Sequence, residues 1–304
     1  MTGKVNVLLS TYNGSAFLVE QMDSLLAQSY PHITITVRDD GSTDDTFSTL
    51  SEYAAKYPNI TISRGERLGA TNSYLALLCD ADPTAEFYAF CDQDDVWLRN
   101  KIQDAVTALQ AYPSGELLIY CSRLEFVDSQ LRHLGYTRLC RGVGLANAMV
   151  ENIVTGCTIV LNRRARDIIC ETLPRVALMH DWWCYLVVSA FGRVIYDEHP
   201  KIKYRRHSGN AVGEPINFTS RLRHFLCRYF SLYKSGPRPS DQVEELYRCF
   251  GPMLRDAERQ MVEELLEAKH RFWARLKYAV RMHVWKQSRL DTAMLPIRIA
   301  TGRF

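Results

Sequence analysis

No apolar run in this 304-residue sequence approaches the length of about 18 residues that a membrane-spanning helix needs. The opening segment MTGKVNVLLS lacks the basic start, the long apolar centre and the small-residue cleavage site of a signal peptide. We therefore expect a cytoplasmic protein.

Paired cysteine motifs are also missing. Nine cysteines are scattered through the predicted strands and helices, and none belongs to a CxxC pair. This spacing argues against a zinc site, and the odd number argues against a disulfide framework. We expect reduced structural thiols. The sequence has no internal repeat and no low-complexity tract, so an ordinary globular protein remains.

Charge is unevenly distributed along the chain. The formal net charge is +3, but residues 215–304 carry +8 and residues 1–214 carry −5. The two regions therefore face different partners. No nucleic-acid-binding motif accompanies the basic region, so we do not expect a nucleic-acid partner.

Short apolar runs alternate with segments of helical periodicity. Strands are predicted at 4–10, 33–37, 60–63, 87–91 and 117–122, with helices in the intervals between them. Such alternation with short loops predicts a mostly parallel sheet covered by helices on both faces. Residues 123–149 are rich in glycine and basic residues and are expected to form loops. Further strands are predicted at 154–162, 193–198 and 201–207, with helices at 163–173 and 180–192, and a helical, basic region follows residue 215.

Aspartates follow two of the predicted strands. VRDDGSTDD at 37–45 follows ITIT, and DQDD at 92–95 follows FYAF. The carboxyl ends of parallel strands form the ligand crevice of an open sheet, so these carboxylates should meet at one edge. Their repulsion requires a compensator, and a divalent cation carrying a phosphorylated ligand is the obvious one. The spacing of Asp92 and Asp94 lets both reach one metal, or a metal and a ribose.

Turn formation and helix capping are the alternative role for these aspartates. We prefer that alternative for Asp44 and Asp45, which precede a predicted helix. A turn does not require three aspartates, so we favour ligand binding over turn formation for Asp92, Asp94 and Asp95.

A resemblance to a known family rests on six segments in order: VLLSTYNGSAFLVEQMDSLLAQSY, VRDDGSTDDT, FCDQDDVW, TGCTIVLN, HDWW and YRRHSGNAVG. Together they resemble the family 2 inverting glycosyltransferases of the GT-A fold, and in particular bacterial rhamnosyltransferases, over residues 4–213. The resemblance implies an α/β GT-A catalytic domain at 1–214. Its nucleotide-sugar half would span about 1–122 and its acceptor half about 123–214, followed by a basic helical C-terminal region at 215–304.

The resemblance also implies roles for particular residues. The nucleotide would contact Thr11, Tyr12, Asn13, Asp39, Arg67, Asn72 and Asp92. Asp94, with Asp92, would hold a Mn²⁺ or Mg²⁺ ion, and Asp181 matches the catalytic base. Family members usually have asparagine where Arg67 stands here, and a guanidinium at that position could instead pair with a phosphate.

Asp181 opens a predicted helix and is followed by two tryptophans. Inverting transfer needs a general base for the acceptor hydroxyl and a cation for the leaving diphosphate. The helix N-terminus favours the ionised carboxylate and the apolar indoles disfavour it, so the sequence leaves its pKa open. A simple N-cap is the alternative role.

Other candidates flank these residues. Trp182 or Trp183 could offer a flat face to a sugar, but neighbours on a helix point about 100° apart, so we expect at most one to do so. His180 is a packing residue or an acceptor contact. His207 is a candidate third metal ligand or diphosphate contact and Arg206 a candidate phosphate clamp, the alternative being a solvated basic edge. RGVGLAN at 141–147 lacks the third glycine and the preceding strand of a dinucleotide site, which excludes NAD.

The leading hypothesis is a metal-dependent transferase that moves L-rhamnose from dTDP-rhamnose to a saccharide or lipid-linked acceptor of bacterial surface polysaccharide. A UDP-sugar donor such as UDP-galactose or UDP-N-acetylglucosamine is the nearest alternative, followed by a glycoside hydrolase and a non-catalytic membrane-associated scaffold. The C-terminal region places apolar residues among cations, at Phe218, Leu222, Phe225, Leu226, Tyr229, Leu276, Val280 and Val284. It could lie on the inner face of the plasma membrane, pack on the catalytic domain or form a homodimer.

Overall fold

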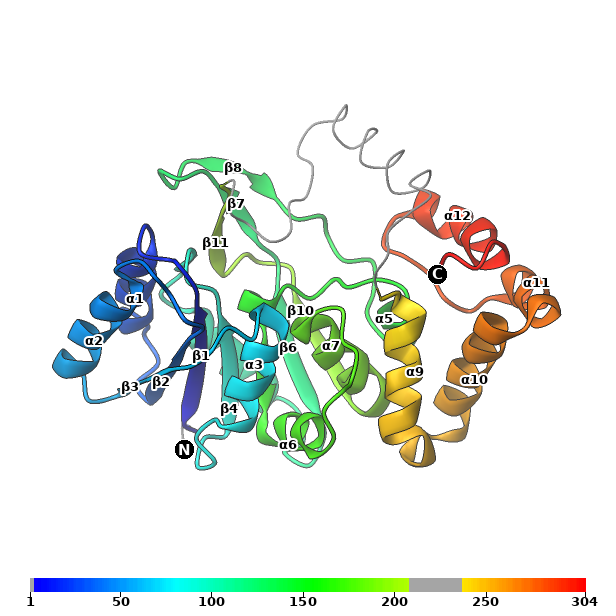
Figure 1. Cartoon of the computed structure of the whole chain (residues 1–304), viewed down its shortest axis with the longest axis horizontal. Helices are drawn as coiled ribbons and strands as arrows, with labels where there is room; N and C mark the ends of the chain where they lie inside the picture. The colour runs from blue at the N-terminus through cyan, green and yellow to red at the C-terminus, as the bar shows by residue number, and fades with distance from the viewer. Residues whose placement is uncertain (1–2, 208–236) are drawn as a thin grey trace.

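The computed structural model describes residues 3–207 and 237–304 (Figure 1). Its described residues form a seven-stranded sheet in the order β10-β6-β9-β4-β1-β2-β3. Only β9 runs antiparallel to its neighbours in this sheet, which confirms the expected mostly parallel architecture. The strands are β1 (Val5–Thr11), β2 (Ile33–Asp39), β3 (Ile60–Arg64), β4 (Phe87–Cys91), β6 (Leu118–Ser122), β9 (Val160–Asn162) and β10 (Arg193–Asp197).

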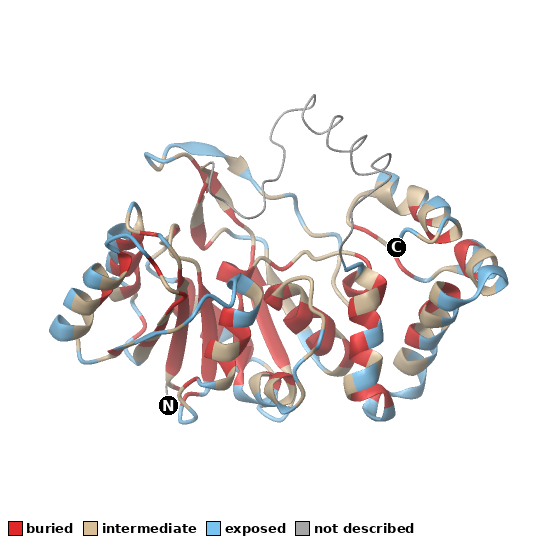
Figure 2. Cartoon of the chain, in the orientation of Figure 1, coloured by how far each residue is buried: buried red, intermediate tan, exposed pale blue. Residues whose placement is uncertain are grey.

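Helices cover both faces of this sheet. One face carries α1 (Leu18–Leu26), α2 (Thr46–Lys56) and α4 (Lys101–Gln110), and the other carries α3 (Ala70–Cys79), α6 (Arg163–Glu171) and α7 (His180–Phe191). Successive strand side chains point to opposite faces, so Val7 and Leu9 join one buried cluster while Leu8 joins the other. The central strands β1, β4, β6 and β9 are buried along almost their whole length, whereas the edge strands β3 and β10 are mostly exposed or half-buried (Figure 2). This burial explains the nearly continuous apolar sequences of β1, β4 and β6.

A second, four-stranded sheet lies beside the carboxyl ends of the first. Its order is β5 (Val96–Trp97), β11 (Ile202–Arg205), β7 (Glu125–Val127) and β8 (His133–Tyr136). The expectation of loops at 123–149 is therefore wrong for β7, β8 and the short helix α5 (Leu145–Ala148). These elements are only three or four residues long, which is too short for a periodicity to show in the sequence.

The C-terminal helices pack on the catalytic core. They are α9 (Pro239–Phe250), α10 (Asp256–His270), α11 (Phe272–Arg281) and α12 (Arg289–Ala300). Phe250 of α9 lies 6.4 Å from Trp183 and 5.8 Å from Phe191 between ring centroids, and one buried cluster runs from the sheet through α7 into these helices. Of the three expected uses of the C-terminal region, packing on the catalytic domain is therefore the one that α9 shows. Within the described residues, no helix is long and apolar enough to cross a membrane. Phe218, Leu222, Phe225, Leu226 and Tyr229 lie outside the described part of the chain.

Replacing Phe250 with alanine should therefore destabilise the whole chain. The ring is almost fully buried against α7, and its removal leaves a cavity that should cost about 3–5 kcal/mol of unfolding free energy. Urea denaturation should show a single transition at a lower midpoint. The exposed Met253→Ala change should stay within about 0.5 kcal/mol of the wild type. A separate early transition confined to the C-terminal helices would contradict the shared core.

Candidate active site at the carboxyl ends of the strands

The first two strands bring their terminal residues to one edge of the sheet. β1 and β2 are parallel and pair Thr11 with Asp39, while β1 and β4 pair Leu9 with Cys91, directly before Asp92. The Thr11 hydroxyl donates to Asp39 Oδ1 at 3.1 Å. The structure therefore brings together the residues that follow the strands.

Asp39 and Asp40 are buried and already have partners in the fold. Asp39 accepts hydrogen bonds from the backbone N–H and hydroxyl of Ser42, and Arg64 Nε lies 3.5 Å from its Oδ2. Asp40 accepts the N–H groups of Leu68 and Gly69 at 2.9 and 2.8 Å and pairs with Arg38. Burial alone would raise the pKa of Asp40, but these hydrogen bonds and the guanidinium hold it below its usual value. Part of the repulsion is thus neutralised by the protein itself.

Tyr12 and Arg67 lie together above this edge. The Arg67 guanidinium carbon is 4.2 Å from the centroid of the Tyr12 ring. The Gln93 side chain holds the Tyr12 backbone through two hydrogen bonds. Its Oε1 accepts the Tyr12 N–H at 2.8 Å, and its Nε2 donates to the Tyr12 carbonyl at 3.1 Å. Asn13 has a positive φ of 47° and ties its segment to β2 through Ser42. Asn72 lies on the exposed side of α3, with Nδ2 3.4 Å from the Leu68 carbonyl.

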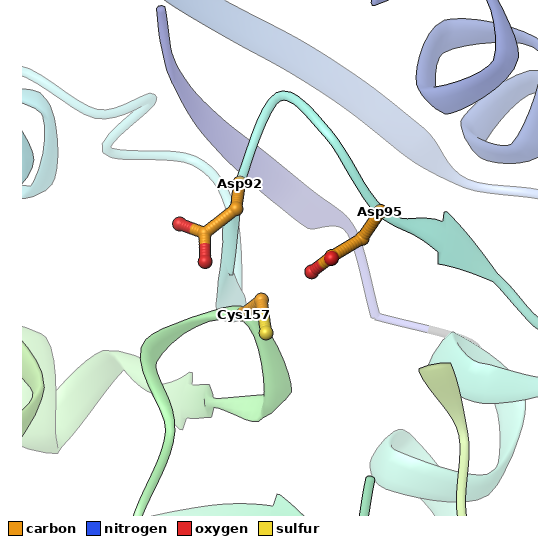
Figure 3. Close-up of side chains that lie close together, drawn as sticks. All are labelled: Asp92, Asp95 and Cys157. Atoms are coloured by element: carbon orange, nitrogen blue, oxygen red, sulfur yellow. The ribbon is translucent and has the colours of Figure 1, made fainter. Parts of the chain in front are cut away.

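Asp92, Asp95 and Cys157 form a compact group below the edge (Figure 3). Ligand atoms of the three lie within 4.8 Å of one another. Burial, and next the charge of Asp94, raise the pKa of Asp92 to about 6, and the Tyr74 hydroxyl donates to Asp92 Oδ1 at 2.6 Å. Burial and the two carboxylates raise the pKa of the Cys157 thiol, so it stays protonated.

A protonated thiol is a poor ligand for Mg²⁺ or Mn²⁺, which prefer oxygen donors. The Cys157 thiol lies beside Asp95, whose Oδ1 accepts the Arg205 N–H at 3.1 Å. Asp95 is fully buried. This group therefore fits a structural role better than a cation site.

Asp94 and His207 form a second pair, nearer the solvent. Asp94 Oδ2 and His207 Nε2 are 2.9 Å apart, and both side chains are partly exposed. A carboxylate with an imidazole is a donor set that suits Mn²⁺. Of the predicted ligands, the structure thus pairs Asp94 with His207 and places Asp92 with Asp95 and Cys157.

Arg205 fixes the end of β11 against the DQDD segment. Its side chain is buried, Nε donates to the Asp94 carbonyl at 2.9 Å, and Nη2 pairs with Glu20. Its guanidinium lies 4.5 Å from the Phe17 ring centroid, and the His207 ring lies 5.0 Å from the same ring. Arg205 therefore holds His207 close to Asp94.

Asp181 occupies the first turn of α7 and is buried. Its Oδ2 accepts the Gly156 N–H at 3.0 Å and its Oδ1 accepts the Trp182 N–H at 2.6 Å. Burial raises the pKa of Asp181 to about 7, and the charge of Asp92 adds to the rise, against these hydrogen bonds. Desolvation thus outweighs the helix N-terminus, and a carboxyl with a pKa near neutrality suits a general base.

The structure separates the three candidates around Asp181. Trp183 is fully buried beside Phe250, so it is not available to an acceptor, in line with the expectation that at most one of the two tryptophans faces a sugar. His180 is also buried: its ring stacks on Tyr74 at 4.1 Å and burial lowers its pKa to about 3, so it is a neutral packing residue. Trp182 is partly exposed, and its indole N–H donates to the Ala148 carbonyl at 2.6 Å.

Arg206 also points away from the Asp94 pair, with its guanidinium 5.3 Å from the Phe126 ring centroid. Adjacent residues of a strand face opposite ways, so the neighbouring Arg205 takes the position at the DQDD segment. The sequence alone does not indicate which of the two arginines lies at the DQDD segment. The alternation of side chains along a strand shows which arginine faces the DQDD segment only after the orientation of one residue of β11 is known.

Two side chains of α9 support the segment before α7, which the sequence did not indicate. Gln242 Oε1 accepts the Leu178 N–H at 3.0 Å, and Glu245 Oε2 accepts the Arg175 N–H at 2.8 Å. Both side chains are buried. The C-terminal region thus helps to position the helix that carries Asp181.

Comparisons with known proteins show which proteins this chain is similar to in sequence. Residues 6–140 match the family described as Glycosyl transferase family 2. The dTDP-rhamnosyl transferase RfbG of Shigella flexneri is 29% identical over 230 residues, covering 71% of this chain and 77% of RfbG. An uncharacterized glycosyltransferase of Rickettsia prowazekii is 23% identical over 220 residues, covering 70% and 67% of the two chains.

Solved structures share the fold. Staphylococcus aureus TarS in complex with UDP-GlcNAc has a TM-score of 0.57 at 17% identity, covering 98% of this chain and 81% of that chain. The Pyrobaculum calidifontis mannosyltransferase PcManGT, in complex with GDP-Man and Mn²⁺, has a TM-score of 0.52 at 18% identity, covering 100% and 81%.

Gly156 should not tolerate a side chain. A Cβ there would lie 2.7 Å from Nε2 of the buried His180, so Gly156→Ala should force the ring or the backbone to move and cost about 1–3 kcal/mol. Gly115→Ala, where a Cβ meets nothing within 4 Å, is the matched control. Thermal and urea unfolding of both variants measure the difference. Equal stability of the two would show that the packing around His180 is looser than described.

Proposed function

We propose that this chain, a glycosyltransferase with the GT-A fold whose residues 6–140 match the Glycosyl transferase family 2 model, transfers L-rhamnose from dTDP-rhamnose to a saccharide acceptor. The observation that carries the proposal is the placement of Asp94 with His207 and of Asp181 around one edge of the sheet, with Asp92 close enough to Asp181 to raise its pKa. The donor is favoured by the likeness to RfbG over most of its length. The acceptor class is a saccharide or lipid-linked saccharide of bacterial surface polysaccharide such as O-antigen, capsule or cell wall.

The proposed binding residues follow from this placement. We assign the nucleotide to the edge formed by Thr11, Tyr12, Asn13, Asp39, Arg67, Asn72 and Asp92. Tyr12 with Arg67 offers a flat surface and a positive charge, which suit a base and a phosphate. Asp94 and His207 would hold a Mn²⁺ or Mg²⁺ ion, which supplies positive charge to the leaving diphosphate. Residues 1–122 would hold the donor and residues 123–214 the acceptor.

Asp181 would perform the proton transfer of the reaction. The acceptor hydroxyl forms a bond to the anomeric carbon as the bond from that carbon to the diphosphate oxygen breaks, which inverts the configuration. The hydroxyl proton passes to the Asp181 carboxylate as the new bond forms. The N–H groups of Gly156 and Trp182 hold that carboxylate in one orientation. Cys184, His180 and Asp92 are the other titratable groups around it, and burial keeps Cys184 and His180 uncharged.

Donor choice tests the proposal directly. With a polyprenyl-linked or soluble saccharide acceptor and Mn²⁺, dTDP-rhamnose should be consumed at least about tenfold faster than UDP-galactose or UDP-N-acetylglucosamine, because the wrong base or sugar loses hydrogen bonds at the site. Product dTDP is measured by chromatography. Preference for a UDP-sugar would keep the fold and change the donor. Cleavage of a glycoside without any nucleotide would indicate a hydrolase instead.

Asp181→Asn should abolish transfer and leave nucleotide affinity unchanged, since the amide preserves the shape and removes the base. In the wild type, the base is active only when deprotonated, so the rate should fall as the pH drops through about 7, to roughly a tenth at pH 6. The rate at saturating donor from pH 5.5 to 8.5 measures this. Asp167→Asn, on the exposed side of α6, is the control. Joint loss of transfer and nucleotide binding in Asp181→Asn, or a flat profile across this range, would contradict the assignment.

We also propose that the basic C-terminal region contacts a membrane, where a lipid-linked acceptor would be located, and that it does not bind nucleic acid. A homodimer is the alternative use of the same surface.

A further inference from the structure

One helix of the C-terminal region exposes large apolar side chains. On α11, Trp273 is 79% exposed and Val280 is 87% exposed. Lys277, also exposed, lies between them, and the spacing of four and three residues places all three on one side of the helix. Arg281 follows next to Val280 and is exposed as well. We call these four residues the α11 face.

The opposite side of the same helix is packed. Tyr278 and Ala279 are buried and belong to the cluster that continues into the catalytic core. The orientation of α11 is therefore fixed by the fold, and its outward side is not simply unfolded or poorly packed. Figure 2 shows the contrast between its exposed outer side and the buried side of α9. An isolated exposed apolar residue is ordinary, but three on one short helix, Phe272, Trp273 and Val280, suggest a binding surface.

We propose that the α11 face docks on the surface of a membrane that contains anionic lipids. The indole of Trp273 has an apolar body and a polar N–H, which suit the boundary between headgroups and acyl chains. Lys277 and Arg281 can reach the headgroups while their aliphatic stems cover apolar surface. The net charge of +8 over residues 215–304 attracts the whole region to an anionic surface.

Charge also favours a membrane over a second copy of the chain. Two copies that met through this face would bring Lys277 and Arg281 of one copy close to the same residues of the other. Like charges in contact are unfavourable, whereas anionic headgroups compensate them. The inference rests on the proposed function, because docking on a membrane serves the transfer reaction only if the acceptor is linked to a lipid. Docking itself requires no transferase activity.

Vesicle sedimentation of the full chain tests the proposal. The protein is incubated with vesicles of phosphatidylcholine alone or of phosphatidylcholine mixed with phosphatidylglycerol, at low and high salt. The wild type should bind the anionic vesicles at least about tenfold more tightly than the neutral ones, and high salt should weaken that binding. Trp273→Ser with Val280→Ser should weaken binding to anionic vesicles by about tenfold or more.

Charge and apolar contributions are separated by two further variants. Lys277→Gln with Arg281→Gln should weaken binding and make it less sensitive to salt. Leu173→Ser with Met253→Ser removes two exposed apolar side chains away from α11 and should leave binding unchanged. Thermal unfolding of each variant checks that the fold is retained.

Three results would overturn the docking proposal: no binding to anionic vesicles, equal binding by the α11 variants and the wild type, or equal loss in the Leu173 and Met253 control. Dimerisation that light scattering detects and that Trp273→Ser with Val280→Ser abolishes would identify a second copy as the occupant and would also overturn it. Turnover with a soluble acceptor is measured in parallel. Vesicle binding without turnover on any donor would support docking and contradict the proposed function, and turnover without vesicle binding would do the reverse.

Discussion

Repulsion among carboxylates at the carboxyl ends of the strands is the constraint on which the site depends. Asp39 and Asp40 end or follow β2, and Asp92, Asp94 and Asp95 follow β4, so five carboxyl groups gather at one edge. The protein compensates some of them itself, by backbone N–H groups and the Arg38 guanidinium at Asp40 and by the backbone N–H of Arg205 at Asp95. Asp92 keeps a raised pKa, and so does Asp181 across the edge. Asp94 lies beside His207 at this edge, and a cation held by these two side chains would compensate the remaining negative charge and bind the diphosphate of the nucleotide.

The position of the proposed base depends on residues far away in the chain. Asp181 is held by Gly156, whose lack of a side chain leaves room for His180, and the segment before α7 is held by Gln242 and Glu245 of α9. Helix α7 itself packs against α9 through Trp183 and Phe250. The C-terminal helices are therefore part of the support of the site. They also present the α11 face to the outside, and docking of this face on a membrane, as proposed, would place the site near a lipid-linked acceptor.

Much of this could be predicted from the sequence, because the signals were local. Apolar runs and helical periodicity predicted the mostly parallel sheet, and the strand ends predicted where Asp39 and Asp92 would lie. Partner choice could not be predicted, since it is set by tertiary contacts. The DQDD segment alone does not show that Asp92 joins Cys157 while Asp94 joins His207. The choice between Trp182 and Trp183 stayed open for a related reason: helix geometry separates the two side chains but does not show which of them faces the core.

Calorimetric titration with nucleoside diphosphates, with and without Mn²⁺, tests the central claim most directly. We expect dTDP to bind the wild type only when Mn²⁺ is present and to bind more tightly than UDP or GDP. This metal-dependent binding should be lost in Asp94→Ala but not in Glu52→Ala, on the exposed side of α2. Binding that is equally tight without a cation, or that survives in Asp94→Ala, would contradict a cation at Asp94 and His207 as the compensator of this edge. If none of the three nucleotides binds, the carboxylates lack the metal-bound nucleotide that we assign to them.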